Sequence, residues 1–328
     1  MTEARRSIAE LVDLGDLDEL LRRVDLLCDD GNWAGVLDLR DRCRAAFERG
    51  RQLWPAASHA EYRLALQAPG RWAAPVLQSG GGRFSLGPLT EVAASSHTWS
   101  ELAPHLPRTP ETALVAHERV VRGEDLTGET TVDTAVLELP LRLQPWEPEY
   151  PLATYKPYSA EFADVPVPPG TRWEEAVPAG DPEPADDPEA IHALVELAVA
   201  WSTQSNGSST AVAVHGDALD AIGGLVGEQV RLAPVDPAHA VALMAWAGAS
   251  GGAHGRRRGM AHGRFAAWWA LAALAGELDR WPDVDDAVDW LRWYRWDLAH
   301  PATGWSLRLA AECPDEGRAW AMEATDYV

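Results

Sequence analysis

A middle segment rich in proline and aromatic residues constrains the fold of this chain more than any other feature. Within residues 126–190, prolines stand at positions 145, 148, 151, 157, 166, 168 and 169, and aromatic residues at positions 146, 150, 155, 158, 162 and 173. Proline lacks the backbone donor that helix interiors need, so long helices are excluded here. The aromatic side chains predict an extended arm that packs against the globular parts of the protein.

Two stretches within this segment carry patterns of their own. Leucines at every second position from 137 to 143 predict a strand, which Pro140 would confine to a sheet edge. Residues 181–189 contain acidic side chains and prolines but no basic residue, which is typical of a linker. We therefore predict a helical domain over 1–125, a Pro/aromatic-rich arm and acidic linker over 126–190, and an α+β domain over 191–328.

The N-terminal part has apolar residues at helical spacing. One stripe runs through residues 8–24 and another through residues 33–47, with glycine and proline punctuation near 69–70 and 79–82. Successive short helices without a fixed-period repeat predict a helical bundle or an irregular solenoid. The expected fold class is mostly α, with a smaller α+β C-terminal part.

The C-terminal part shows mixed patterns. Residues 210–214 predict a strand, and residues 238–246 and 265–278 predict helices. Alternating residues over 294–298 and 305–309 predict a hairpin with its turn at 300–304. Pro314, followed by two acidic residues, predicts the start of a final helix.

A glycine- and arginine-rich loop at residues 251–264 is the strongest candidate site. It contains no acidic residue, in a chain whose net charge is -22. Glycines let backbone amides approach a ligand, a following helix favours an anion at its N-terminus, and guanidinium groups bind phosphate or carboxylate. The candidate anion-binding residues are Arg256, Arg257, Arg258, His262 and Arg264. The alternative is that these arginines pair with internal carboxylates, such as those of residues 181–189.

Part of this loop resembles the pyrophosphate-binding loop of the GNAT acetyltransferases. The similarity lies in the Arg-x-x-Gly-x-Ala spacing of Arg256, Gly259 and Ala261. In that family the loop follows a central strand and opens a helix, and its backbone amides hold coenzyme A. The resemblance implies an enzyme that binds a phosphorylated or coenzyme A ligand through residues 251–264.

A second candidate site is the pair His215 and Asp217. An imidazole and a carboxylate at the end of a strand could bind a metal or act as acid and base. Alternatively, Asp217 is the N-cap of a helix that begins at Ala218. The three cysteines are widely spaced, and we expect neither a structural metal nor a cofactor.

Several function classes are disfavoured by the sequence. The acidic charge repels nucleic acid and anionic membranes, so neither is an expected partner. No Gly-Lys pair exists, which excludes a Walker-type P-loop, and no signal peptide is recognisable, which favours the cytoplasm. The leading hypothesis is a binding or interaction protein that takes a protein partner or an anionic small molecule, without an identifiable catalytic motif. The acyltransferase-like enzyme is the alternative.

Residues 254–269 and 290–305 resemble an uncharacterised protein family of actinobacteria. This resemblance extends over most of the chain and implies no activity, cofactor or catalytic residue. It favours a cytoplasmic location.

Overall fold

The chain divides into two units, and the proline-rich middle segment contributes to both. The computed structural model describes residues 6–168, 170–178, 180–285, 287–298 and 304–327. The helical unit comprises Met1–Val136 and Ala153–Phe162, and the sheet unit comprises Leu137–Leu152 and Ala163–Val328. The predicted domain boundaries at residues 125 and 190 stay predictions.

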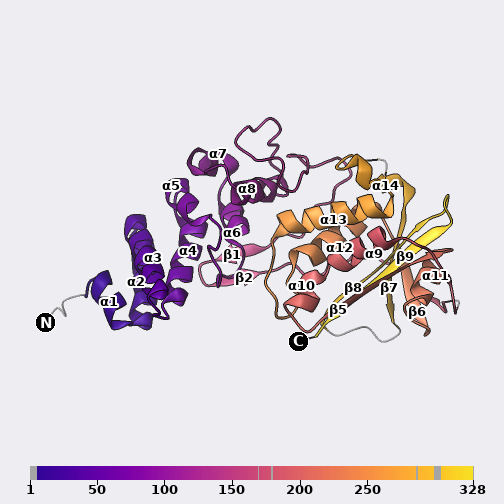
Figure 1. The fold of residues 1–328 in the computed structure, drawn as a ribbon, viewed down its shortest axis with the longest axis horizontal. Coiled ribbons are helices and arrows are strands. Elements are labelled where there is room, and N and C mark those ends of the chain that lie inside the picture. The colour runs from indigo at the N-terminus through magenta and orange to yellow at the C-terminus, as the bar shows by residue number, and fades with distance from the viewer. Residues whose placement is uncertain (1–5, 169, 179, 286, 299–303, 328) are drawn as a thin grey trace. The chain divides into compact units, whose positions relative to one another are not determined.

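The helical unit is built from short capped helices. Their bounds are α1 (Ile8–Leu14), α2 (Leu17–Asp29), α3 (Trp33–Glu48), α4 (Trp54–Gln67), α5 (Gly70–Ala73), α6 (Leu89–Ser96), α7 (Trp99–Leu102) and α8 (Pro110–Val120). Polar side chains satisfy the first amides of several helices: Ser7 and Glu10 form a capping box on α1, and Asn32 caps α3. No strand occurs in the described residues before position 125, so the predicted helical region is confirmed (Figure 1).

The arm packs on protein surface within the helical unit. It contributes the antiparallel hairpin of β1 (Thr154–Lys156) and β2 (Ser159–Glu161). Tyr155 is buried, and its hydroxyl donates to the buried carboxylate of Glu91 over 2.6 Å. The hydroxyl of Tyr62 on α4 donates to the Lys156 carbonyl over 2.6 Å. Aromatic packing and buried hydrogen bonds therefore hold this part of the arm in place.

The sheet unit contains an antiparallel sheet with strand order β3-β6-β7-β8-β9-β5-β4. Its strands are β3 (Glu174–Ala176), β4 (Glu183–Pro184), β5 (Ser208–His215), β6 (Val230–Val235), β7 (Arg292–Leu298), β8 (Trp305–Cys313) and β9 (Arg318–Asp326). Its helices are α9 (Pro188–Glu196), α10 (Val199–Thr203), α11 (Ala218–Gly223), α12 (Pro237–Ala249), α13 (Met260–Leu274) and α14 (Ala287–Trp290).

Helices cover both faces of this sheet. On one face, Ile222 of α11 packs with Trp296 of β7 and Ala319 of β9 in a buried apolar cluster. On the other face, the indole of Trp320 donates to Asp187, the N-cap of α9, over 3.0 Å. Side chains alternate between the faces along each strand, so neighbouring residues of β9 contact helices on opposite faces of the sheet.

Two sequence predictions of single elements are wrong, and the predicted hairpin strands are confirmed. No strand forms over residues 137–143, because Leu137 and Glu138 have positive φ values that an extended strand does not allow. No helix follows Pro314, because residues 314–317 form the turn between β8 and β9. The strands β7 and β8 confirm those predicted at 294–298 and 305–309. Residues 300–303 of the predicted turn lie outside the described residues.

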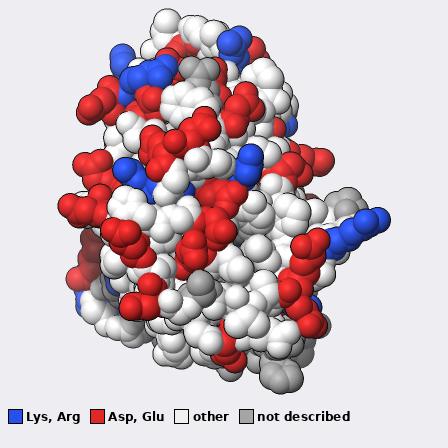
Figure 2. Space-filling view, turned by 90° about the vertical axis from the view of Figure 1, so that its right-hand side faces the viewer, with Lys and Arg blue, Asp and Glu red and all other residues white. Residues whose placement is uncertain are grey.

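The surface carries the acidic charge that the composition indicates. On the face shown in Figure 2, acidic side chains spread widely and basic side chains occur in a few separate places. Among the helices that the structure describes, none has the length and apolar character needed to span a bilayer.

Candidate functional site

Arg264 lies in a fully buried ion pair. Its guanidinium donates to both carboxylate oxygens of Glu147, with distances of 2.7 Å from Nε and 2.7 Å from Nη2. Both side chains are 0% exposed. Nη1 donates to the carbonyl of Pro140 over 2.9 Å, and Nη2 also donates to the carbonyl of Arg142 over 3.0 Å. Arg264 therefore connects α13 to residues 140–147 of the arm.

Glu147 is held as a carboxylate by this arrangement. Burial raises the pKa of Glu147, but the hydrogen bonds and charge of Arg264, with help from the Tyr150 hydroxyl, lower it by more. The indole of Trp268 and the amide of Gln144 also donate to this carboxylate. Because every partner is internal, Arg264 acts as a clamp within the sheet unit and does not face a ligand site.

The first part of the loop is braced by other elements of the sheet unit. The amide of Ala253 donates to the buried carboxylate of Asp326 over 2.6 Å, and the amide of Arg256 donates to the side chain of Gln204 over 3.3 Å. The Arg256 side chain is exposed, whereas those of Arg257 and His262 are half-buried. The backbone of the loop is therefore fixed at these points, and its candidate side chains differ in how far they are exposed to solvent.

The loop follows helix α12 and not a strand. The amides of Arg258 and Gly259 both donate to the carbonyl of Ala249, the last residue of α12, over 2.8 and 3.3 Å. Gly259, with φ of 98°, is the N-cap of α13. The strand–loop–helix arrangement implied by the acetyltransferase resemblance is therefore wrong here.

Among the loop arginines, Arg258 lines a cavity of the sheet unit. The cavity measures about 280 Å³ and lies beside α9 and α13. His192 and Glu196 from α9, and Phe265 and Trp269 from α13, also line it. The backbone bond to Ala249 fixes the position of the Arg258 main chain beside the cavity.

The charge of Arg258 is only partly compensated. Burial lowers the pKa of this guanidinium, and the nearby carboxylate of Glu196 raises it by less. Within the described residues, Arg258 forms no ion pair within 4 Å and no side-chain hydrogen bond. A half-buried cation without direct partners is costly, so an acceptor group entering the cavity would stabilise it.

The aromatic wall of the cavity is rigid. The rings of Phe265 and Trp269 stack with centroids 6.2 Å apart, and Trp281 meets both edge-on at 5.7 and 5.6 Å. Such ring contacts fix side-chain orientation at little entropic cost. The cavity thus offers a cation, a carboxylate and an apolar surface to a single ligand.

His215 and Asp217 are placed apart from this cavity, at the end of β5. Asp217 is the N-cap of α11 and accepts from the amides of Leu219 and Asp220 over 2.9 and 3.0 Å. The predicted cap is therefore confirmed. In the part of the chain that the structure describes, no cluster of three or more histidine, cysteine or acidic residues could hold a metal ion.

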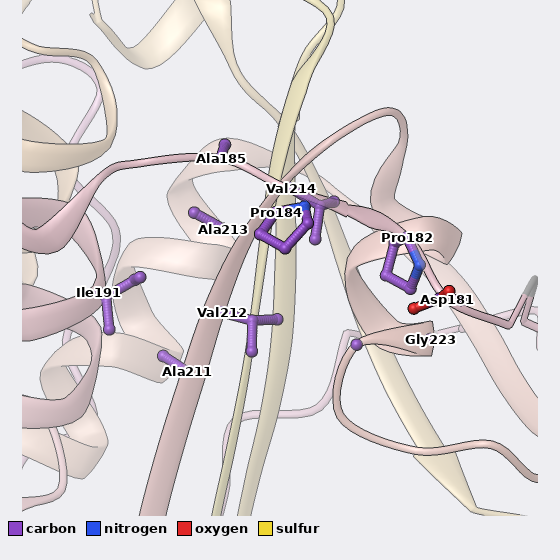
Figure 3. A pocket seen from close by; sticks show the side chains of 11 residues that line it. Asp181, Pro182, Pro184, Ala185, Ile191, Ala211, Val212, Ala213, Val214 and Gly223 are labelled. Atoms are coloured by element: carbon purple, nitrogen blue, oxygen red, sulfur yellow. The ribbon is translucent and has the colours of Figure 1, made fainter.

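A second cavity, of about 480 Å³, lies along β5, the strand next to the sheet edge. Figure 3 shows Ala211 and Ala213 on one side of this strand and Val212 and Val214 on the other. Asp181 is the charged residue that lines it, and the rest of the lining is apolar or glycine. Because this cavity presents no cation, it does not fit the anion that the loop predicts.

The structure adds residues that sequence reasoning missed. His192 and Glu196 are one helical turn apart on α9, and both reach the cavity from a segment far from the loop in sequence. Glu147 stands in the proline-rich arm, where its single carboxylate carries no recognisable motif. The sequence shows that His192 and Glu196 are four residues apart, which places them on one face of a helix. It does not show that this face meets Arg258.

The fold and cavity define a two-unit α+β protein in which a mainly helical unit is joined to an antiparallel sheet covered by helices on both faces. The chain belongs to a family of unknown function, DUF6183, which matches residues 18–327. The expected membership of an uncharacterised family is thus confirmed. Neither the curated proteins nor the solved structures include a match to this chain.

Proposed function

We propose that this protein is a cytoplasmic binding protein whose sheet unit takes a small organic ligand in the Arg258 cavity. The ligand carries a carboxylate or phosphate that pairs with Arg258, and a hydrogen-bond donor such as an ammonium group that pairs with Glu196. Its apolar body packs on Phe265 and Trp269. The observation that carries this proposal is the half-buried guanidinium without a direct partner, opening into a cavity with a preformed aromatic wall.

Charge and size support this ligand class. Glu196 lines the same cavity as Arg258, so a ligand with one anionic and one cationic group satisfies both residues, whereas a dianion would meet the Glu196 carboxylate. A cavity of about 280 Å³ is at the small end of ligand sites, which favours a molecule of amino-acid size. The net charge of -22 supports the expectation that neither nucleic acid nor an anionic membrane is a partner.

A thermal-shift titration tests the proposal, since a ligand that binds the folded state raises the melting temperature. L-phenylalanine and L-tryptophan serve as probes with both charges. Phenylacetate lacks the ammonium group, phenethylamine lacks the carboxylate, and inorganic phosphate lacks the apolar body. We expect the amino acids to stabilise the protein more than each of the three partial probes.

The matched variants are Arg258→Gln and Arg256→Gln, which remove one cation each from the same loop. A charge-assisted hydrogen bond contributes about 1.5–3 kcal/mol, so Arg258→Gln should weaken binding by about 10- to 150-fold. Arg256→Gln should leave affinity unchanged, because that side chain is exposed and does not line the cavity. Equal affinities of both variants and the unaltered protein would refute the site.

A further inference from the structure

The helical unit has a cavity of its own, of about 570 Å³, between α3, α4 and the glycine-rich loop that follows residue 78. Its lining combines aromatic rings with two arginines, Arg44 and Arg83, and two carboxylates, those of Glu48 and Glu61. It shares no residue with the Arg258 cavity. The residues that line it belong to the helical unit.

Three aromatic side chains converge on this cavity from three segments. Phe47 comes from α3, Trp54 from the start of α4, and Phe84 from the loop. Phe47 and Phe84 are 47% and 44% exposed, although removing an apolar ring from water is favourable. The rings of Trp54 and Phe84 contact each other with centroids 3.8 Å apart. Exposed rings grouped at a concavity mark a binding surface, because covering them is favourable.

Two arginines supply positive charge at the same place. Arg44 donates through Nε to the buried carboxylate of Glu61 and through Nη2 to the Gly80 carbonyl over 3.2 Å, which fixes its orientation. Its side chain is 34% exposed and lines the cavity. Arg83 lies over the Phe84 ring at 5.6 Å and forms no ion pair in the described part of the chain.

The loop that carries Arg83 and Phe84 is fixed in shape. The Gly82 amide donates to Glu61 over 2.8 Å, and Gly82 has a φ of 64°. A Cβ atom at this position would lie 2.4 Å from Cγ of Leu89. Glycine is therefore required where the loop passes α6, and one buried carboxylate organises both the loop and Arg44. Such preorganisation lowers the entropic cost of binding.

We propose that this cavity binds a planar aromatic molecule that carries an anionic group, either a phosphate or a carboxylate. The ring system stacks on the exposed aromatic side chains, as bases do on protein aromatics, and the anionic group pairs with Arg83 and Arg44. The volume of about 570 Å³ accommodates a mononucleotide-sized ligand.

Isothermal titration calorimetry with four probes tests both features of this ligand. Adenosine monophosphate and flavin mononucleotide carry a ring and a phosphate, salicylate carries a ring and a carboxylate, and ribose 5-phosphate carries a phosphate alone. We expect ribose 5-phosphate to bind at least about tenfold more weakly than the best aromatic anion, because stacking is lost. The preference between phosphate and carboxylate identifies the anionic group.

The variants Phe84→Leu and Arg83→Gln alter exposed side chains, so both should fold. Each should weaken the best probe by about tenfold. Phe162→Leu, at an equally exposed phenylalanine outside the cavity, is the control and should bind normally. Arg258→Gln should also leave this binding intact, which separates the result from that of the sheet unit.

Equal affinities for ribose 5-phosphate and the aromatic anions would overturn the proposal. So would unchanged binding in both Phe84→Leu and Arg83→Gln, or failure of every aromatic probe to bind at millimolar concentration.

Discussion

Replacing Arg264 by methionine removes the cation from the most deeply buried ion pair of the sheet unit. Methionine keeps much of the aliphatic volume, so the change tests the charge and not the packing. In the variant, Glu147 loses two charge-assisted hydrogen bonds of 2.7 Å each, and the carbonyls of Pro140 and Arg142 lose their donors. The arm is thereby released from α13 at several points at once.

The expected cost follows from this geometry. Breaking a buried pair by removing one partner costs about 3–5 kcal/mol, because the other charge stays buried without compensation. For a unit of this size, each kcal/mol lowers the melting temperature by about 2–4 °C, so a fall of about 6–20 °C is expected. Glu147→Gln should also be costly, since it leaves the buried Arg264 without a counter-charge and the single amide oxygen can accept from only one of the two donors, the Trp268 indole or the Gln144 amide.

Chemical denaturation of the two single variants and of the double variant measures the coupling directly. The double variant should be more stable than the sum of the single effects predicts, because it leaves no unpaired buried charge. A coupling energy close to zero, or a cost below about 1 kcal/mol for Arg264→Met, would refute the clamp.

The pH dependence supplies an independent check on the same pair. The pKa of Glu147 is lower in the folded state than its ordinary value of 4.5, so its contribution to stability is present above pH 4.5. This contribution is lost as the pH falls through the lowered value. The unaltered protein should therefore lose stability in acid more steeply than Glu147→Gln, and parallel curves for the two proteins would contradict the assignment.

Further predictions concern single features of the fold. Asp217→Ala should cost about 1 kcal/mol through loss of the α11 cap, and added chelator should not change the melting temperature if this residue is only a cap. Gly263→Ala should destabilise the protein clearly in thermal melts, because its Cβ would lie 2.2 Å from the Ala245 carbonyl oxygen, whereas Gly227→Ala, with open space around it, should be nearly neutral. Tyr155→Phe should cost about 1–3 kcal/mol in urea denaturation, since a buried carboxylate loses a donor.

Local patterns were enough to predict much of the fold. Apolar spacing and glycine and proline punctuation indicated the N-terminal helices, and alternation indicated the strands β7 and β8. These signals were readable because helix and strand periods are set by the backbone within a few residues. The same reasoning failed at residues 137–143, where alternating leucines occur without a strand because the arm turns to offer its carbonyls to Arg264.

In the candidate site, too, the sequence identified some features and the tertiary structure decided others. Composition alone identified an arginine loop without acids that needed anions from elsewhere, and the Asp217 cap was readable from its position before Ala218. Only the tertiary structure decided that Glu147 takes Arg264 while Arg258 lines a cavity beside Glu196. The physical reason is that charge pairing acts through space. The loop's sequence shows how many cations need a compensating charge. The packing of α9, α13 and the arm determines which cation is buried with an internal partner and which one can contact a ligand.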